Sequence, residues 1–322
     1  MLLLLAGMAM QTTTQAQDES WQMLSSTRDP FSAYCAYFRT PQEGWEAGAK
    51  GILHTADGGK TWEKQWAEQG RVLCIYFKNA KDGFAGGESN LYMETHDGGA
   101  TWKADFSHFQ SAKFEKIVFV SEQTGYMFCS VTVYRTTDGG KTWKDIGPKK
   151  PSEESSEDYT GFVARDAKHL IVVGRHEMMF TSDNGGDTWV ANKKDFFTGP
   201  RKNYYSVAFA KDGKTGWISC SDGSGSDIDC LYTTDGGANW TPKKQFNSYQ
   251  LKKMEFNGNT GWALSDMSSH TMYTTYDGGA TWNEETVSKE HKVNTAYLFS
   301  PGVGYAGIGG SDYLFNLYVP KK

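Results

Sequence analysis

The 322-residue chain lacks the features of several common protein classes. It has only five cysteines and eight prolines, its N-terminal apolar run is too short to span a bilayer, and no segment shows helical periodicity. The cysteines fit no metal-binding spacing, and the seven histidines show no paired spacing. These absences predict an all-β chain that holds no metal and no other cofactor.

The chain also lacks an excess of positive charge: its 33 lysines and arginines are outnumbered by 38 aspartates and glutamates, for a formal net charge of −5. That balance argues against a general nucleic-acid binder. A phosphate-binding Gly-Lys-Ser/Thr loop, a dinucleotide fingerprint and a serine nucleophile elbow are missing from the sequence. Nucleotide and flavin chemistry therefore have no support.

What the sequence does contain is one short motif, Ser/Thr-x-Asp-x-Gly-x-Thr-Trp, in six near-copies. The first copy runs from Thr55 to Trp62. The motif aspartates are Asp57, Asp97, Asp138, Asp183, Asp235 and Asp277, at spacings of 40, 41, 45, 52 and 42 residues. Repeats of this length are typical of stacked or ring-shaped arrays of small sheets.

Each repeat also has a second signal upstream of the motif, a Phe followed by a Gly-aromatic pair, as in Phe38 and Gly44-Trp45. Counting one degenerate copy at Phe162, there are seven such units. Each unit is predicted to form four short strands, for example residues 74–77, 84–87, 91–95 and 102–105. The fold class predicted is all-β, a seven-bladed β-propeller of four-stranded antiparallel blades.

The last unit ends near Val319 after three strands, before its own motif. Its fourth strand must come from elsewhere in the chain. Residues 20–24 resemble an orphan fourth strand, with Trp21 in the place that Trp62 holds in its own unit. We expect this N-terminal strand to join the last blade, because that pairing closes the ring and hides sheet edges.

The motif itself is interpreted as a turn. An aspartate at the start of a tight loop can accept hydrogen bonds from backbone N–H groups one to three residues on, and the glycines allow positive φ. Because a catalytic pair must converge on one substrate and these aspartates are spread around a ring, we assign them a structural role. The Asp183 copy is expected to form a looser turn with one extra residue before Trp189.

The ends and the cysteines bear on where the protein resides. Residues 1–17 resemble a secretory signal peptide, and residues 18–322 are predicted to form a single propeller domain, exported to the periplasm or beyond the cell. Cys220 and Cys230 flank a hairpin-like loop and either form a local disulfide or belong to five buried thiols. Oxygen side chains alternate over residues 222–229, but the bidentate Glu of a calcium loop is missing, so no metal is predicted there.

The motif is the Asp-box, or bacterial neuraminidase repeat, and the longer segment from Gly44 to Trp62 resembles the photosystem II stability/assembly factor family. The resemblance extends over essentially every repeat. It implies an exported or lumenal seven-bladed propeller that holds protein partners. Relatives also occur in bacteria that do not photosynthesise, so the resemblance implies the fold more strongly than the role.

Sialidases share the Asp-box, and Phe38-Arg39-Thr40-Pro41 looks like their substrate-binding Phe-Arg-Ile-Pro segment. The register, however, puts Arg39 in a turn between first and second strands, on the same face as the Asp-boxes. A sialidase also needs three arginines that converge on a carboxylate, and this chain has seven arginines in all. Because the Asp-box is shared, a glycan-active or glycan-binding ring is kept as the alternative hypothesis.

A binding site is expected on the other face of the ring, where the turns after second and fourth strands are longer and more varied. We call this the loop-bearing face. Arginines and exposed aromatic residues dominate protein interfaces. The binding residues predicted on this basis are Arg28, Trp66, Arg71, Arg175, His176, Arg201, Tyr204 and Tyr205. The hypothesis is an exported, non-enzymatic propeller that binds a protein or peptide, as an assembly or stability factor for an envelope complex.

Overall fold

The computed structural model describes residues 21–27, 33–49, 51–66, 70–109, 113–149, 158–192, 196–197, 202–221, 228–246, 251–265, 270–290, 292–308 and 315–320. The predicted signal peptide lies outside these ranges. Every regular element in them is a β-strand. The described part of the chain accordingly has no helix with the length and apolar character of a bilayer span.

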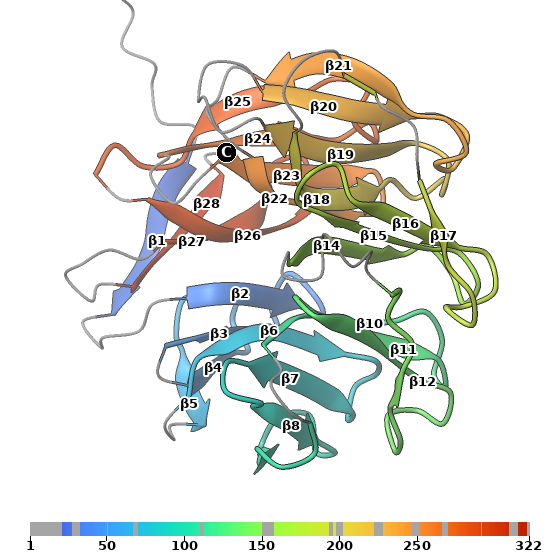
Figure 1. Cartoon of the computed structure of the whole chain (residues 1–322). Coiled ribbons are helices and arrows are strands. Elements are labelled where there is room, and N and C mark those ends of the chain that lie inside the picture. The colour runs from blue at the N-terminus through green and yellow to red at the C-terminus, as the bar shows by residue number, and fades with distance from the viewer. Residues whose placement is uncertain are drawn as a thin grey trace, which may run out of the picture.

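Seven four-stranded sheets make up the molecule, and six of them consist of four consecutive strands. We number these six as blades 1 to 6 (Figure 1). Blade 1 contains β2 (Ala33–Phe38), β3 (Gly44–Gly48), β4 (Gly51–Thr55) and β5 (Glu63–Trp66). Blade 2 contains β6 (Val72–Phe77), β7 (Gly83–Gly87), β8 (Tyr92–Thr95) and β9 (Lys103–Asp105). Blade 3 contains β10 (Phe114–Phe119), β11 (Gly125–Cys129), β12 (Thr132–Thr136) and β13 (Lys144–Asp145). Blade 4 contains β14 (Tyr159–Ala164), β15 (Leu170–Gly174), β16 (Met179–Ser182) and β17 (Val190–Ala191). Blade 5 contains β18 (Asn203–Phe209), β19 (Gly216–Ser221), β20 (Ile228–Thr233) and β21 (Thr241–Phe246). Blade 6 contains β22 (Leu251–Asn257), β23 (Thr260–Ser265), β24 (Thr271–Thr275) and β25 (Asn283–Thr286).

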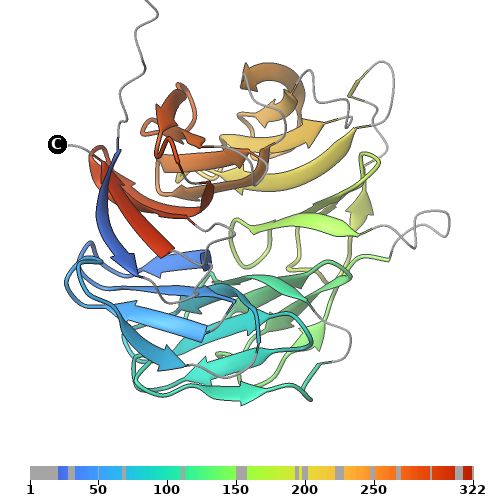
Figure 2. The same cartoon turned by 90° about the vertical axis from the view of Figure 1, so that its left-hand side faces the viewer.

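The remaining sheet is assembled from both ends of the chain, and we call it the composite sheet. Its strand order is β26 (Val293–Ser300), β27 (Val303–Ile308), β28 (Phe315–Pro320) and β1 (Trp21–Thr27). Strand β1 pairs antiparallel with β28, from Trp21 opposite Pro320 to Thr27 opposite Phe315 (Figure 2). The predicted count of seven blades is therefore wrong, because only six sheets are blades made of four consecutive strands. The composite sheet lies beside them and closes the ring.

The order of the sheets around the ring follows from the contacts of their inner strands. Strand β2 contacts β6, β6 contacts β10, β14 contacts β18, and β18 contacts β22. The circle is completed where β11 meets β14, where β23 meets β26, and where β26 meets β2. The composite sheet therefore lies between blade 6 and blade 1.

Burial falls from the second strand of each blade to the fourth. All five residues of β3, β7, β11 and β15 are buried, because these strands are covered on both faces by neighbouring sheets. The outer strands β13 and β17 have two residues each, all exposed. Such short edges leave little backbone for pairing with another chain.

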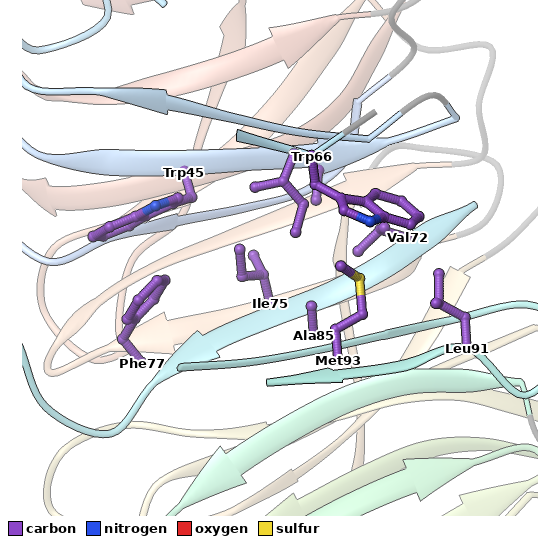
Figure 3. Packing of buried hydrophobic residues seen from close by; sticks show 10 residues of the cluster. Trp45, Trp66, Val72, Ile75, Phe77, Ala85, Leu91 and Met93 are labelled. Carbon is purple, nitrogen blue, oxygen red and sulfur yellow. The ribbon is translucent and has the colours of Figure 1, made fainter. Parts of the chain in front are cut away.

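Large side chains fill the spaces between sheets. Between blades 1 and 2, the rings of Trp45 and Phe77 stack with centroids 3.9 Å apart (Figure 3). Trp66 and Leu91 belong to the same buried cluster. Burial of aromatic surface of this kind supplies much of the stability of the ring.

Every inner strand has a β-bulge at the same place near its start. The Cα register skips one residue in each of the seven inner strands, including β26 of the composite sheet. The extra residues are Tyr34, Leu73, Glu115, Thr160, Tyr205, Lys252 and Asn294. The composite sheet thus repeats the geometry of the six continuous blades.

None of the five cysteines forms a disulfide, which decides between the two interpretations of Cys220 and Cys230. Cys220 lies opposite Asp229 in the β19–β20 register, and side chains alternate between sheet faces, so Cys220 and Cys230 point to opposite sides of blade 5. Cys220 packs in the cluster shared with blade 4 and Cys230 in the cluster shared with blade 6. A disulfide between them is excluded by this geometry.

Candidate functional site

The two faces of the ring differ in what their turns do. On one face, each Asp-box turn is bonded to the turn between the first and second strands of its own blade. Gly58 N donates to Gln42 O at 2.7 Å, and the same backbone bond recurs in blades 2 to 6. Arg39 lies in one of these turns. The prediction that Arg39 shares a face with the Asp-boxes is confirmed.

The Asp57 turn shows how the motif works. Asp57 Oδ1 accepts from Thr61 N at 2.9 Å and Asp57 Oδ2 from the Thr61 hydroxyl at 2.6 Å. Thr55 Oγ1 accepts from Gly59 N at 2.8 Å, and Gly58 and Gly59 have φ of 75° and 85°. The Thr61 hydroxyl and N–H lower the pKa of Asp57 to about 2. The main N–H donor is four residues on, not one to three as predicted, and all of these contacts are internal to the turn.

The fourth Asp-box needs a correction. Asn184, not Asp183, occupies the aspartate position, because Asn184 Oδ1 accepts from Thr188 N at 2.9 Å and Ser182 Oγ accepts from Gly186 N at 2.8 Å. These are the bonds that Asp57 and Thr55 make in blade 1. The turn therefore has the ordinary length and is not looser, and Asp183 occupies the variable position before it.

Three arginines on the Asp-box face bind backbone carbonyls of the next blade. Arg39 donates to Ala80 O at 2.8 Å, Arg135 to Gly185 O at 2.8 Å, and Arg165 to Gly213 O at 2.9 Å. Each arginine thus ties a different pair of blades. Within the described residues these three guanidinium groups do not converge, as a sialidase carboxylate site requires.

The loop-bearing face brings four of the predicted binding residues together where blades 4 and 5 meet. The β15–β16 turn, residues 175–178, carries Arg175 and His176, both exposed. It lies against the start of β18: Glu177 N donates to Lys202 O at 2.8 Å, and His176 N donates to Asn203 Oδ1 at 3.1 Å. We call residues 175–178 together with residues 202–205 the blade 4/5 cluster.

The same cluster contains residues that the sequence analysis missed. Glu177 Oε1 accepts from Lys202 N at 3.1 Å, so the turn and the strand start are bonded in both directions. His176 and Glu177 have φ of 55° and 62°, which non-glycine residues adopt rarely. One backbone bond and two bonds to the side-chain oxygens of Asn203 and Glu177 hold this turn in place. The equivalent turn at residues 87–91 in blade 2 has the same geometry, with Ser89 and Asn90 also at positive φ.

Other predicted residues lie elsewhere or are buried. Tyr204 is 0% exposed and packs in the core cluster between blades 4 and 5, and Tyr205 is half-buried. Trp66 is 6% exposed and packs between blades 1 and 2, as Figure 3 shows, which is a core position. Arg71 is exposed near Trp66, with its Nη1 3.7 Å from Glu88 Oε1. Arg28 and Arg201 lie outside the described residues.

No metal centre is formed by the described residues, since no group of three or more His, Cys, Asp or Glu side chains in them could hold an ion. The chemistry that the loop-bearing face offers is that of recognition: exposed arginines, a histidine and backbone groups on a bonded turn. Arg71 with Glu88 forms a second, separate patch on blade 2.

A family model matches part of the chain. The family model described as "Photosynthesis system II assembly factor YCF48" matches residues 65–156. The chain resembles the YCF48 assembly factors. It is 22% identical over 193 residues to the photosystem II assembly lipoprotein Ycf48 of Synechococcus sp. (strain CC9902), covering 58% of the chain and 52% of that protein. The Picosynechococcus sp. lipoprotein is 25% identical over 293 residues, covering 86% of the chain and 81% of that protein.

Solved YCF48 structures share the fold. YCF48 from Cyanidioschyzon merolae superposes with a TM-score of 0.70 at 17% identity, over 94% of the chain and 98% of that structure. A structure of YCF48 bound to D1 peptide gives a TM-score of 0.66 at 18% identity, over 95% and 98%. At these identities the likeness shows the propeller fold. The chain spans about half the length of the Synechococcus relative.

Proposed function

We propose that this chain is an exported, non-enzymatic propeller that binds a protein or peptide partner through its loop-bearing face, as an assembly or stability factor for an envelope complex. The observation that carries the proposal is the likeness to YCF48 chains, one of them solved with a D1 peptide bound. Export is supported by the signal-like residues 1–17 and by relatives named as lipoproteins.

The division of labour between the faces supports this proposal. The Asp-box aspartates and Arg39, Arg135 and Arg165 are occupied by contacts within the ring. Arg71 and Arg175 are exposed on the opposite face. Exposed arginines on a rigid frame are suited to hold a partner, and the blade 4/5 cluster fixes the turn that carries Arg175.

A capture experiment tests the proposal. The exported chain is used to capture partners from native envelope extract, and the variants Arg71→Glu and Arg175→Glu are compared with Lys141→Glu, a charge reversal at an exposed residue of the Asp-box face. We expect Arg175→Glu and Arg71→Glu to lose captured protein while Lys141→Glu retains it. Equal capture by all variants would remove both arginines from the site. Turnover of a sialidase or glycosidase substrate by the purified chain would contradict the non-enzymatic role.

A further inference from the structure

Glu46, in the middle of β3, is an unusual residue at one seam of the ring. Its side chain is 0% exposed, and neither carboxyl oxygen has a hydrogen-bond partner among the described residues. A buried polar group without a partner is unfavourable, and a buried charge without one is far more so. Such a residue is rarely retained for packing alone.

The other sheets show what this position normally holds. The equivalent central residues of the second strands are Ala85, Met127, Val172, Ile218, Ala263 and Ala306, all fully buried and apolar. The fold therefore does not need a carboxyl group here. Its presence is specific to blade 1.

The carboxyl group lies at the interface between blade 1 and the composite sheet, which we call the closing seam. A Cβ built on Gly307 of β27 would be 3.2 Å from Glu46 Oε1 and 2.9 Å from Thr295 Cγ2 of β26. Ala33 of β2 lies 3.6 Å from the same point. The missing side chain at Gly307 thus leaves the space that Glu46 fills, across the seam from its own blade.

Among the described residues, no charge compensates Glu46 at the closing seam. The titratable groups on the strands packed against it are Tyr34, Cys35 and Tyr37 on β2, His54 on β4, Tyr297 on β26 and Tyr305 on β27. Burial raises the pKa of the Cys35 thiol to about 12, raises the pKa values of the Tyr37, Tyr297 and Tyr305 hydroxyls and lowers the pKa of His54. These five groups are therefore neutral near pH 7.

Lys253, on β22, donates its Nζ to the backbone oxygen of Tyr34 on β2 at 2.8 Å. After burial, the charge of Lys253 lowers the pKa of the Cys35 thiol, and the charges of Glu255 and Glu46 raise it. For Glu46, burial alone sets the pKa, which lies well above its usual range.

We propose that Glu46 makes the closing seam a pH-sensitive clasp, in which a neutral carboxyl keeps the seam shut and loss of its proton at higher pH opens blade 1 from β26 and β27. The closed seam binds the Glu46 proton more tightly than the opened, solvated seam does. Closure is therefore fully favoured below about pH 4.5, the ordinary value for a glutamate, and weakens as pH rises through the raised value. The two ends of the chain meet in the composite sheet, so opening at this seam leaves the six continuous blades intact.

Hydrogen exchange of the full-length chain between pH 5 and pH 8 tests the proposal. The exchange of amides in β2 and β27 is divided by that of β15 in blade 4, which cancels the common effect of pH on chemical exchange. In the wild type we expect this ratio to rise by up to about tenfold per pH unit between the ordinary and the raised pKa. In Glu46→Gln, which keeps the shape and removes the proton, the ratio should stay constant.

Glu284→Gln, a change at an exposed glutamate of β25, serves as the matched control and should behave as the wild type. A constant ratio in the wild type would overturn the proposal, as would a rise that persists in Glu46→Gln. If Glu46→Gln does not fold, the wild-type series decides by itself. A seam ratio that does not change with pH then contradicts the clasp.

Discussion

Trp21 Nε1 donates a hydrogen bond of 2.6 Å to Glu285 Oε2, across the boundary between the composite sheet and blade 6. The Asp-box tryptophan of blade 2 makes the equivalent contact: Trp102 Nε1 lies 3.5 Å from Gln65 Oε1 on the outer strand of blade 1. Trp21 therefore occupies the place of an Asp-box tryptophan, although its sheet has no Asp-box. One residue near the N-terminus fastens the composite sheet to the ring.

Removal of Trp21 should loosen the ring at this point. Trp21 is 0% exposed, and truncation of a fully buried tryptophan lowers the free energy of unfolding by about 3–5 kcal/mol. We expect Trp21→Ala to reduce the urea midpoint strongly. Trp21→Phe, which keeps most of the buried area and loses the bond to Glu285, should lose about 1.5–3 kcal/mol. A midpoint unchanged in Trp21→Ala would mean that β1 is not part of the ring.

The Asp-box turn should accept asparagine, because blade 4 already uses Asn184. Asp138 Oδ1 accepts a hydrogen bond from Thr142 N at 2.9 Å. Asp138→Asn keeps an oxygen that can accept this bond. Asp138→Ala leaves that N–H without its partner. We expect the melting temperature to fall less in Asp138→Asn, which keeps the acceptor oxygen and loses the charge, than in Asp138→Ala, where it should fall by at most about 4 °C. Equal losses in both variants would show that charge, not geometry, holds the turn.

Acid should weaken the ring through the same turns. Hydrogen bonds from Thr61 and its counterparts lower the pKa of Asp57, Asp97, Asp138 and Asp235 to about 2. A depressed pKa means that the stabilisation is present above about pH 3.8 and is lost as pH falls through about 2. Melting temperature measured from pH 5 to pH 2 should fall most steeply below pH 4. A flat profile there would contradict the hydrogen-bond assignment.

The blade 4/5 cluster predicts an effect of Glu177 on partner binding. In Glu177→Ala the side-chain bond to Lys202 N is lost, and the strained turn that carries Arg175 loses one of its supports. We expect weaker capture of the partner at a nearly unchanged melting temperature. The matched control is Glu122→Ala, an exposed glutamate on the Asp-box face, which should capture normally. Full capture by Glu177→Ala would separate this turn from the binding site.

The thiols give a further check on the structure. Because Cys220 and Cys230 face opposite sides of blade 5, the denatured chain should contain five titratable thiols without prior reduction. A reducing agent should leave the melting temperature unchanged. Fewer than five thiols in the unreduced chain would reveal a disulfide that this register forbids.

Much of the fold could be predicted because the repeat records both the strands and the turns. The strands expected in the second repeat agree with β6 to β9 within two residues, and Trp21 was recognised by its likeness to the Asp-box tryptophans. The Asp183 assignment was wrong because Asp and Asn stand side by side and both can accept the turn's hydrogen bonds. Local sequence could not choose between them.

The candidate site was less predictable. Trp66 looked like an exposed aromatic of a loop, but it ends β5 and packs in the core, since the depth of a loop depends on the neighbouring blade. Glu177 and Lys202 were missed because their contact joins residues 25 positions apart in different blades. Glu46 was missed because a polar residue between Trp45 and Ala47 fits the alternating pattern of a half-buried strand, and its burial without a hydrogen-bond partner appears only in the structure.

Site-specific photo-cross-linking tests the central claim, that a partner binds the loop-bearing face, most directly. A photoreactive residue is placed at Arg71, at Arg175, or at Lys141 on the Asp-box face, and the chain is irradiated in native envelope extract. The account predicts a cross-linked protein from positions 71 and 175 and none from position 141. Cross-links from position 141 in the absence of any from 71 and 175 would contradict it.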